Sequence, residues 1–162
     1  MTGIEIINAG IGGLTASEWN AAAHDASLFG GSWNNNEWSW TSGFELSIDY
    51  SGYDFAIIHL GINDIYKNPT SPIEDIVSDF ESGINNIINE IKISTDSKFK
   101  IFLCTIIPSY AVQGDANYEV LNMKIKEIAD QNENVYLIDL NKYSECKQMT
   151  PYSYIHLTAI GY

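Results

Sequence analysis

FAIIHLGIND, Phe55–Asp64, is the stretch that decides the fold, because a nearly continuous apolar run ends abruptly in a glycine turn. Such a run is typical of a strand in a parallel sheet, whose two faces are covered by helices. KIFLCTII, Lys100–Ile107, has the same character. We expect four strands of this kind, over residues 4–8, 54–60, 99–107 and 135–140.

Segments with helical periodicity separate these strands. Thr15-Ala-Ser-Glu18 has the pattern of a capping box, in which the Thr hydroxyl and the Glu carboxylate each bind a free amide at the start of a helix. Ser71-Pro72-Ile73-Glu74 predicts a second box with Pro at the first helical position. An apolar stripe at helical spacing follows from Ile73 to Ile91, and a third helix is expected over about 115–131. Alternating strands and helices predict one α/β domain around a parallel sheet.

Residues 29–53 interrupt this alternation. The segment FGGSWNNNEWSWTSGF, 29–44, is rich in Gly, Ser, Asn and aromatic residues. Its composition predicts a long surface loop or insertion. Trp33, Trp38 and Trp40 could bind a sugar ring or an acyl chain, or could form the small core of the loop itself.

The charge of the chain excludes some partners. Eight Lys and Arg against 21 Asp and Glu give a net charge of −13, which repels nucleic acid and anionic membrane surfaces and favours solubility. No apolar run approaches the roughly 18 residues of a membrane span. The first residues, MTGIEIINAG, lack the basic and apolar regions of a secretion signal. Cys104 and Cys146 lack metal-type spacing and are expected to be free thiols.

The glycine turn in INAGIGGLTASEW, residues 7–19, suits two kinds of chemistry. A dinucleotide site needs Gly-x-Gly-x-x-Gly after a strand and an acidic residue at the end of the next strand. Here Asn8 replaces the first glycine before Gly10 and Gly13, and the residues before Glu37, SWNNN, predict no strand. A flavin enzyme is therefore the weaker interpretation, and a backbone N–H offered to an oxyanion is the stronger one.

Two further motifs fall at the same edge of the predicted sheet. Asn63 follows the most apolar strand, where ligands of open α/β sheets bind, and its amide can donate to an oxyanion. Taken alone, Gly61–Asp64 could be only a turn. His156 in YIHLTAIGY precedes an expected helix start and could act as a general base. His59 lies among core residues and is interpreted as structural.

Together, NAGIGG, GIND and IHLTAIGY resemble motifs of the SGNH, or GDSL, hydrolases, and the resemblance covers nearly the whole chain. These are serine esterases and acylhydrolases with a flavodoxin-like three-layer α/β/α sandwich. The resemblance implies that Gly13 offers a backbone N–H and Asn63 a side-chain N–H to the oxyanion. It also implies that His156 is the base that activates the serine, and it implies no metal or cofactor.

The chain departs from the family pattern in two places. Gly-Asp-Ser, which carries the nucleophile at the end of the first strand, does not occur in the 162 residues, and Gly114-Asp115-Ala116 has Ala in place of Ser. Ser32 is the least unsuitable internal substitute. Ser153 replaces the Asp three residues before the histidine, and a backbone carbonyl could orient His156 in its place at some cost in rate. We therefore expect a single domain over 1–162 that is truncated at both ends, with the nucleophile upstream of Met1.

The resemblance implies hydrolysis of small acyl esters, including esters of carbohydrates, through a serine acyl-enzyme. The alternative is a non-catalytic carbohydrate-binding or structural module that keeps the fold and the Trp-rich segment without the nucleophile. The coding DNA upstream of Met1 distinguishes them. An in-frame strand ending in Gly-Asp-Ser supports the enzyme, and a nearby stop codon supports the module.

Overall fold

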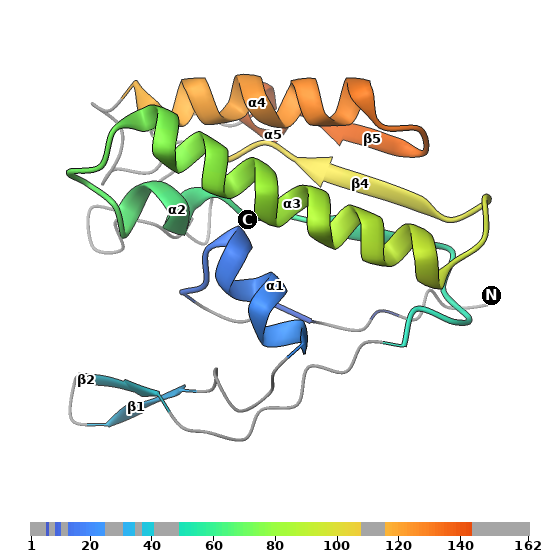
Figure 1. Ribbon diagram of the computed structural model, residues 1–162, viewed down its shortest axis with the longest axis horizontal. Coiled ribbons are helices and arrows are strands. Elements are labelled where there is room, and N and C mark those ends of the chain that lie inside the picture. The colour runs from blue at the N-terminus through green and yellow to red at the C-terminus, as the bar shows by residue number, and fades with distance from the viewer. Residues whose placement is uncertain are drawn as a thin grey trace.

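A parallel three-stranded sheet with helices packed on it forms the centre of the molecule in a computed structural model (Figure 1). The structure describes residues 6, 9–10, 13–24, 31–34, 37–40, 49–107 and 116–143. The strands of the sheet are β3 (Phe55–Ile58), β4 (Lys100–Cys104) and β5 (Val135–Ile138), in the order β3-β4-β5. Both pairings are parallel, with Ile101 opposite Ala56 on one side and Val135 on the other. The predicted α/β fold is confirmed, and the arrangement is consistent with a flavodoxin-like fold.

Helices connect the three parallel strands. The described helices are α1 (Ala16–His24), α2 (Ile62–Tyr66), α3 (Ile73–Ser94), α4 (Asn117–Gln131) and α5 (Leu140–Tyr143). Of these, α2 and α3 lie between β3 and β4, and α4 lies between β4 and β5. The long helices α3 and α4 run side by side along the sheet, and α1 packs against α3 (Figure 1). The short helix α2 begins within a few residues of the end of β3, at the carboxyl edge of the sheet.

One face of the sheet and the inner faces of α3 and α4 make the core. Ile101 and Leu103 of β4 are each only 1% exposed and belong to one core cluster with buried residues of α3 and α4. The predicted apolar stripe of α3 is confirmed, since six of its residues are buried: Ile76, Phe80, Ile84, Ile87, Ile88 and Ile91. From α4, Leu121, Ile125 and Ile128 join the same cluster. Burial of this apolar surface is the main favourable contribution to the stability of the fold.

The ends of several strands and helices differ from the sequence predictions. The strands are shorter than expected, and Leu140 begins α5 instead of ending β5. The predicted capping box at Ser71 is wrong, because α3 begins at Ile73 and Pro72 occupies the N-cap without a side-chain hydrogen bond. The carbonyl of Pro72 instead accepts the N–H groups of Asp75 and Ile76, at 3.1 and 3.3 Å.

The Trp-rich segment contains an antiparallel hairpin, where the sequence predicted an irregular loop. Its strands are β1 (Gly31–Asn34) and β2 (Glu37–Trp40), and Trp33 lies opposite Trp38 in the register. Alternation of Trp with polar residues at a period of two is a strand pattern that the composition had obscured. Of the strand predicted over 4–8, only Ile6 is described, without regular structure, and the other residues lie outside the described part.

The described cysteine is Cys104, at the end of β4. It is buried and free, as predicted, and burial raises the pKa of its thiol to about 11. Cys146 lies outside the described residues.

Candidate active site

The turn after β3 is fixed by a glycine. Gly61 has a φ of +120°, in the region that favours glycine, and precedes the first residue of α2. A Cβ atom at this position would lie 2.8 Å from Cδ1 of Ile106 and 3.2 Å from Cε2 of Phe80. Because Gly61 has no side chain, the turn packs directly on the core. This contact fixes the backbone position from which Asn63 and Asp64 extend.

The turn at Gly13 is the second part of the site. Gly13 is exposed, with a φ of +83°, and it precedes Leu14, which is only 1% exposed. The predicted capping box at the start of α1 is confirmed. The Thr15 N–H donates to the Glu18 carboxylate at 2.8 Å, and the Glu18 N–H donates to the Thr15 hydroxyl at 3.2 Å. A buried apolar residue and a capped helix thus fix the chain directly after Gly13.

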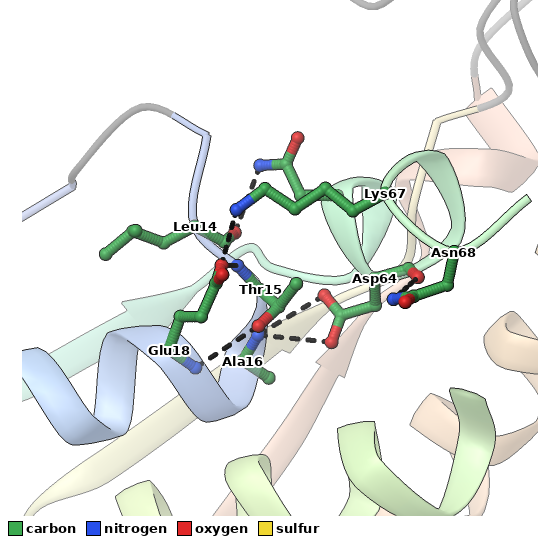
Figure 2. A network of polar contacts seen from close by, with 8 residues as sticks. Leu14, Thr15, Ala16, Glu18, Asp64, Lys67 and Asn68 are labelled. Atoms are coloured by element: carbon green, nitrogen blue, oxygen red, sulfur yellow. Dashed lines mark hydrogen bonds and ion pairs between the residues drawn. The ribbon is translucent and has the colours of Figure 1, made fainter. Parts of the chain in front are cut away.

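Three polar contacts join the two turns (Figure 2). The side-chain amide of Asn63 donates to the carbonyl oxygen of Leu14 at 3.0 Å. The backbone N–H of Ala16 donates to the two carboxylate oxygens of Asp64, at 3.1 and 3.3 Å. Nearer the surface, Lys67 Nζ lies 2.6 Å from Oε2 of Glu18. The two motifs that the sequence predicted to share one edge of the sheet therefore lie in contact.

The side-chain amide of Asn63 has a second N–H group besides the one that contacts Leu14. The amide nitrogen of Asn carries two hydrogens, and the bond to the Leu14 carbonyl uses one of them. That bond fixes the plane of the amide, so the direction of the second hydrogen is fixed as well. A preoriented N–H next to the Gly13 turn, at the carboxyl end of β3, can bind an oxygen atom that becomes negatively charged.

Asp64 is a buried carboxylate, with 3% of its surface exposed. Burial raises its pKa to about 6, and the charge of Glu18 adds to this, whereas the N–H groups of Ala16 and of Asp64 itself and the charge of Lys67 act in the opposite direction. At neutral pH the group is therefore mostly ionised. Its negative charge lies at the N-terminus of α1, where the helix dipole favours an anion.

The turn after β4 is held by a polar contact that the sequence analysis missed. Asn122 of α4 is buried, accepts the Ile106 N–H at 2.7 Å and donates to the Ile106 carbonyl at 3.0 Å. Beside it, the Thr105 hydroxyl donates to Asp139 at 3.1 Å. The ion pair with Lys126, at 2.9 Å, holds the pKa of Asp139 below its usual range. The available signal was a polar residue directly after Leu121 on the buried stripe of α4.

For the other residues that the sequence singled out, the structure describes less or nothing. His156 and Ser153 lie outside the described residues, and for Ser32 and the three tryptophans only the backbone of the hairpin is described. His59 directly follows β3 and is exposed, so it does not belong to the core. A shallow hollow of about 320 Å³ lies at the opposite edge of the sheet, between residues 50–54 and 94–99, and does not reach Asn63.

The described part of the chain shows neither a metal-binding cluster nor a membrane-spanning helix. No group of three or more His, Cys, Asp or Glu side chains there is arranged to hold a metal ion. None of its helices has the length and apolar character needed to cross a bilayer.

Comparison with protein families gives a match that spans the chain. A family model described as the GDSL-like Lipase/Acylhydrolase family matches residues 1–162. No curated protein and no solved structure matches the chain.

Proposed function

The chain belongs to the GDSL-like lipase/acylhydrolase family, and from that premise we propose that it hydrolyses small acyl esters through a serine acyl-enzyme. In this proposal Gly13 and Asn63 donate hydrogen bonds to the oxyanion, and His156 is the general base. The family supports a hydrolase that acts on a small-molecule ester. The residue roles and the choice of ester are our proposal.

The observation that carries the proposal is the hydrogen bond from Asn63 to the carbonyl of Leu14, at 3.0 Å. It brings a side-chain amide to the residue that directly follows Gly13. N–H donors aimed at one point can stabilise the oxyanion of a tetrahedral intermediate.

The proposed reaction passes through an acyl-enzyme. The serine oxygen attacks the ester carbonyl carbon while the histidine takes the hydroxyl proton, and the electron pair of the C=O bond moves to the oxygen. The resulting oxyanion accepts hydrogen bonds from Gly13 and Asn63. Its collapse expels the alcohol, which takes the proton back from the histidine. Water then repeats the sequence on the acyl-enzyme and releases the acid.

The nucleophile is expected in a Gly-Asp-Ser motif, which the 162 residues do not contain. Ser32 of the hairpin is the internal substitute, and we propose it only as a control position. The net charge of −13 disfavours anionic esters, so neutral acyl esters are the proposed substrates, including esters of carbohydrates. The tryptophans of β1 and β2 are of a residue type that suits contact with a sugar ring or an acyl chain.

The absence of Gly-Asp-Ser from these residues also favours one alternative, a binding or structural module on the same fold. Such a module would bind a carbohydrate ester without cleaving it. It shares the fold and the Trp-rich segment with the enzyme, and differs only in having no nucleophile.

The test is made on the protein expressed from its complete natural reading frame. We expect it to hydrolyse p-nitrophenyl acetate and to be labelled on one serine by a fluorophosphonate, with the labelled residue mapped by mass spectrometry. His156→Ala should abolish labelling, because the serine would lose its base. Ser32→Ala is the matched control and should keep both activities. A folded protein that neither hydrolyses the ester nor takes the label would contradict the enzyme and favour the module.

A further inference from the structure

We propose that Asp64 is a positioning residue for this reaction. Its carboxylate holds the segment Gly13–Ala16 against the turn that carries Asn63, so that the two donors to the oxyanion keep a fixed separation. This inference rests on the proposed function. It concerns a residue that would contact neither the substrate nor the nucleophile.

The geometry of the contact is the first argument. Asp64 reaches from α2 to Ala16, the first residue of α1, across 48 positions of the chain (Figure 2). Both of its oxygens face the same N–H, at 3.1 and 3.3 Å, and the side chain is buried. Water does not compete for a hydrogen bond inside the protein, so this bond restrains the segment more strongly than a surface contact would.

The capping of α1 gives the second argument. The first N–H groups of a helix have no partner within the helix. The box formed by Thr15 and Glu18 satisfies the amides of those two residues and leaves the amides of Ala16 and Ser17 between them. Asp64 supplies the acceptor for the Ala16 amide. Another part of the chain therefore contributes to the cap of α1, which ties the start of α1 to α2.

A second bond runs between the same two segments in the opposite direction. Asn63 donates to the carbonyl of Leu14, while Ala16 donates to Asp64. One bond would leave the segments free to rotate about it, whereas two bonds two residues apart fix their relative orientation. Since Asp64 directly follows Asn63, the anchor and the proposed donor share one stretch of backbone.

Close backbone contact with α3 restricts the position of the start of α1. At Gly83 of α3, a Cβ atom would lie 2.6 Å from the nitrogen of Ser17 and 2.7 Å from the carbonyl carbon of Ala16. The start of α1 is thus in close backbone contact with α3 on one side and bonded to Asp64 on the other. Loss of the Asp64 acceptor would free only the side that faces Asn63.

Burying the charged carboxylate of Asp64 is energetically unfavourable, which argues against a role in stability alone. Burial raises the pKa of the carboxyl to about 6, which measures how unfavourable its charge is in the folded protein. An apolar side chain at a buried position avoids such a penalty and is often neutral or stabilising. A charged group retained beside a proposed donor agrees with a positioning role.

The test compares Asp64→Ala with Asp64→Asn, which keeps an acceptor of the same shape. Lys67→Ala is the matched control, because it removes the exposed ion pair between α1 and the residue that directly follows α2. For p-nitrophenyl acetate, normalised to the sites that a fluorophosphonate labels, we expect Asp64→Ala to lower kcat by about 10- to 100-fold with KM little changed, since misplacement of a reacting group by about 1 Å can reduce the rate by about 10². Asp64→Asn should restore kcat to within about fivefold of the wild type, and Lys67→Ala should stay within about twofold.

Hydrogen exchange at the Ala16 amide separates this inference from the proposed function. We expect faster exchange in Asp64→Ala and wild-type exchange in Asp64→Asn and Lys67→Ala. If Asp64→Ala does not fold, Asp64→Ser, whose hydroxyl is too short to reach Ala16, takes its place. An inactive wild type would contradict the proposed function. An active wild type with an unchanged kcat in the Asp64 variant, despite faster exchange, would overturn the positioning role alone.

Discussion

The side-chain amide of Asn63 lies 3.0 Å from the carbonyl oxygen of Leu14, although 49 positions separate the two residues in the chain. The contact unites the turn after β3 with the turn before α1. On one side of it lies Gly13, and on the other lies Asp64, whose carboxylate accepts the N–H of Ala16. The proposed oxyanion site is thus built from two turns that hold each other in place, and its parts can be tested one at a time.

The buried carboxyl of Asp64 should make stability depend on pH. Its pKa is raised from 3.8 to about 6, so the folded protein binds a proton at this carboxyl more tightly than the unfolded chain does. The stability that protonation supplies is complete below pH 3.8 and is lost as the pH rises through about 6. Asp64→Asn does not titrate there. The stability of this variant relative to the wild type should therefore rise between pH 4 and pH 7, by on the order of 3 kcal/mol. Urea unfolding at the two pH values measures it, and a difference that does not change with pH would contradict the assignment.

Gly61→Ala should destabilise the protein more than Gly52→Ala does. Both glycines have positive φ, +120° and +85°, so both variants carry backbone strain of roughly 1 kcal/mol or more. At Gly61 the new methyl group would also meet Ile106 at 2.8 Å, whereas nothing lies within 4 Å at Gly52. Overpacking adds about 1–3 kcal/mol. Thermal or urea unfolding of the pair decides this, and equal losses would mean that Ile106 and Phe80 move aside freely.

Gly83→Ala tests the close packing of α1 on α3. In the middle of an exposed helix this change stabilises by about 1 kcal/mol. Here the methyl group would meet the backbone of Ala16 and Ser17, so we expect a loss of about 1–3 kcal/mol instead. The exposed neighbour Ser82→Ala is the control and should change stability by less than about 0.5 kcal/mol. A stabilised Gly83→Ala would show that α1 does not sit as closely as described.

Asn122→Ala should be among the most damaging changes in α4. It would leave both the N–H and the carbonyl of Ile106 without their partner, where each unsatisfied buried group costs about 1–3 kcal/mol. The next residue, Met123, is 71% exposed, so Met123→Ala should have an effect near zero. Chemical denaturation compares the two variants. Similar stabilities would indicate that water replaces the amide of Asn122.

Much of the fold could be predicted from the sequence because its signals are local. The apolar runs within β3 and β4 and the stripe of α3 are periodic patterns, and the box of Thr15 and Glu18 spans four residues. The same kind of reasoning was wrong at Ser71, where a similar pattern forms no side-chain cap and the Pro72 carbonyl accepts the bonds instead. A capping motif indicates which side chain could bind, whereas the local backbone decides whether it does.

The site was predictable only in outline. Gly13 and Asn63 could be placed at one edge because parallel strands end there. The anchor at Asp64 could not be predicted, because its partner is an ordinary backbone amide 48 residues away that carries no sequence signal. Asn122 escaped for the same reason, since it binds the backbone of Ile106.

The most direct test of the proposed site is the kcat of Asn63→Ala for p-nitrophenyl acetate, measured on the protein from its complete natural reading frame. We expect kcat to fall by about 10²–10³-fold with little change in KM, as for the loss of one donor to an oxyanion. Fluorophosphonate labelling of the same serine should persist, which would establish that the nucleophile and base remain in place. A kcat within about twofold of the wild type would mean that Asn63 binds no oxyanion, and the account of this site would be wrong.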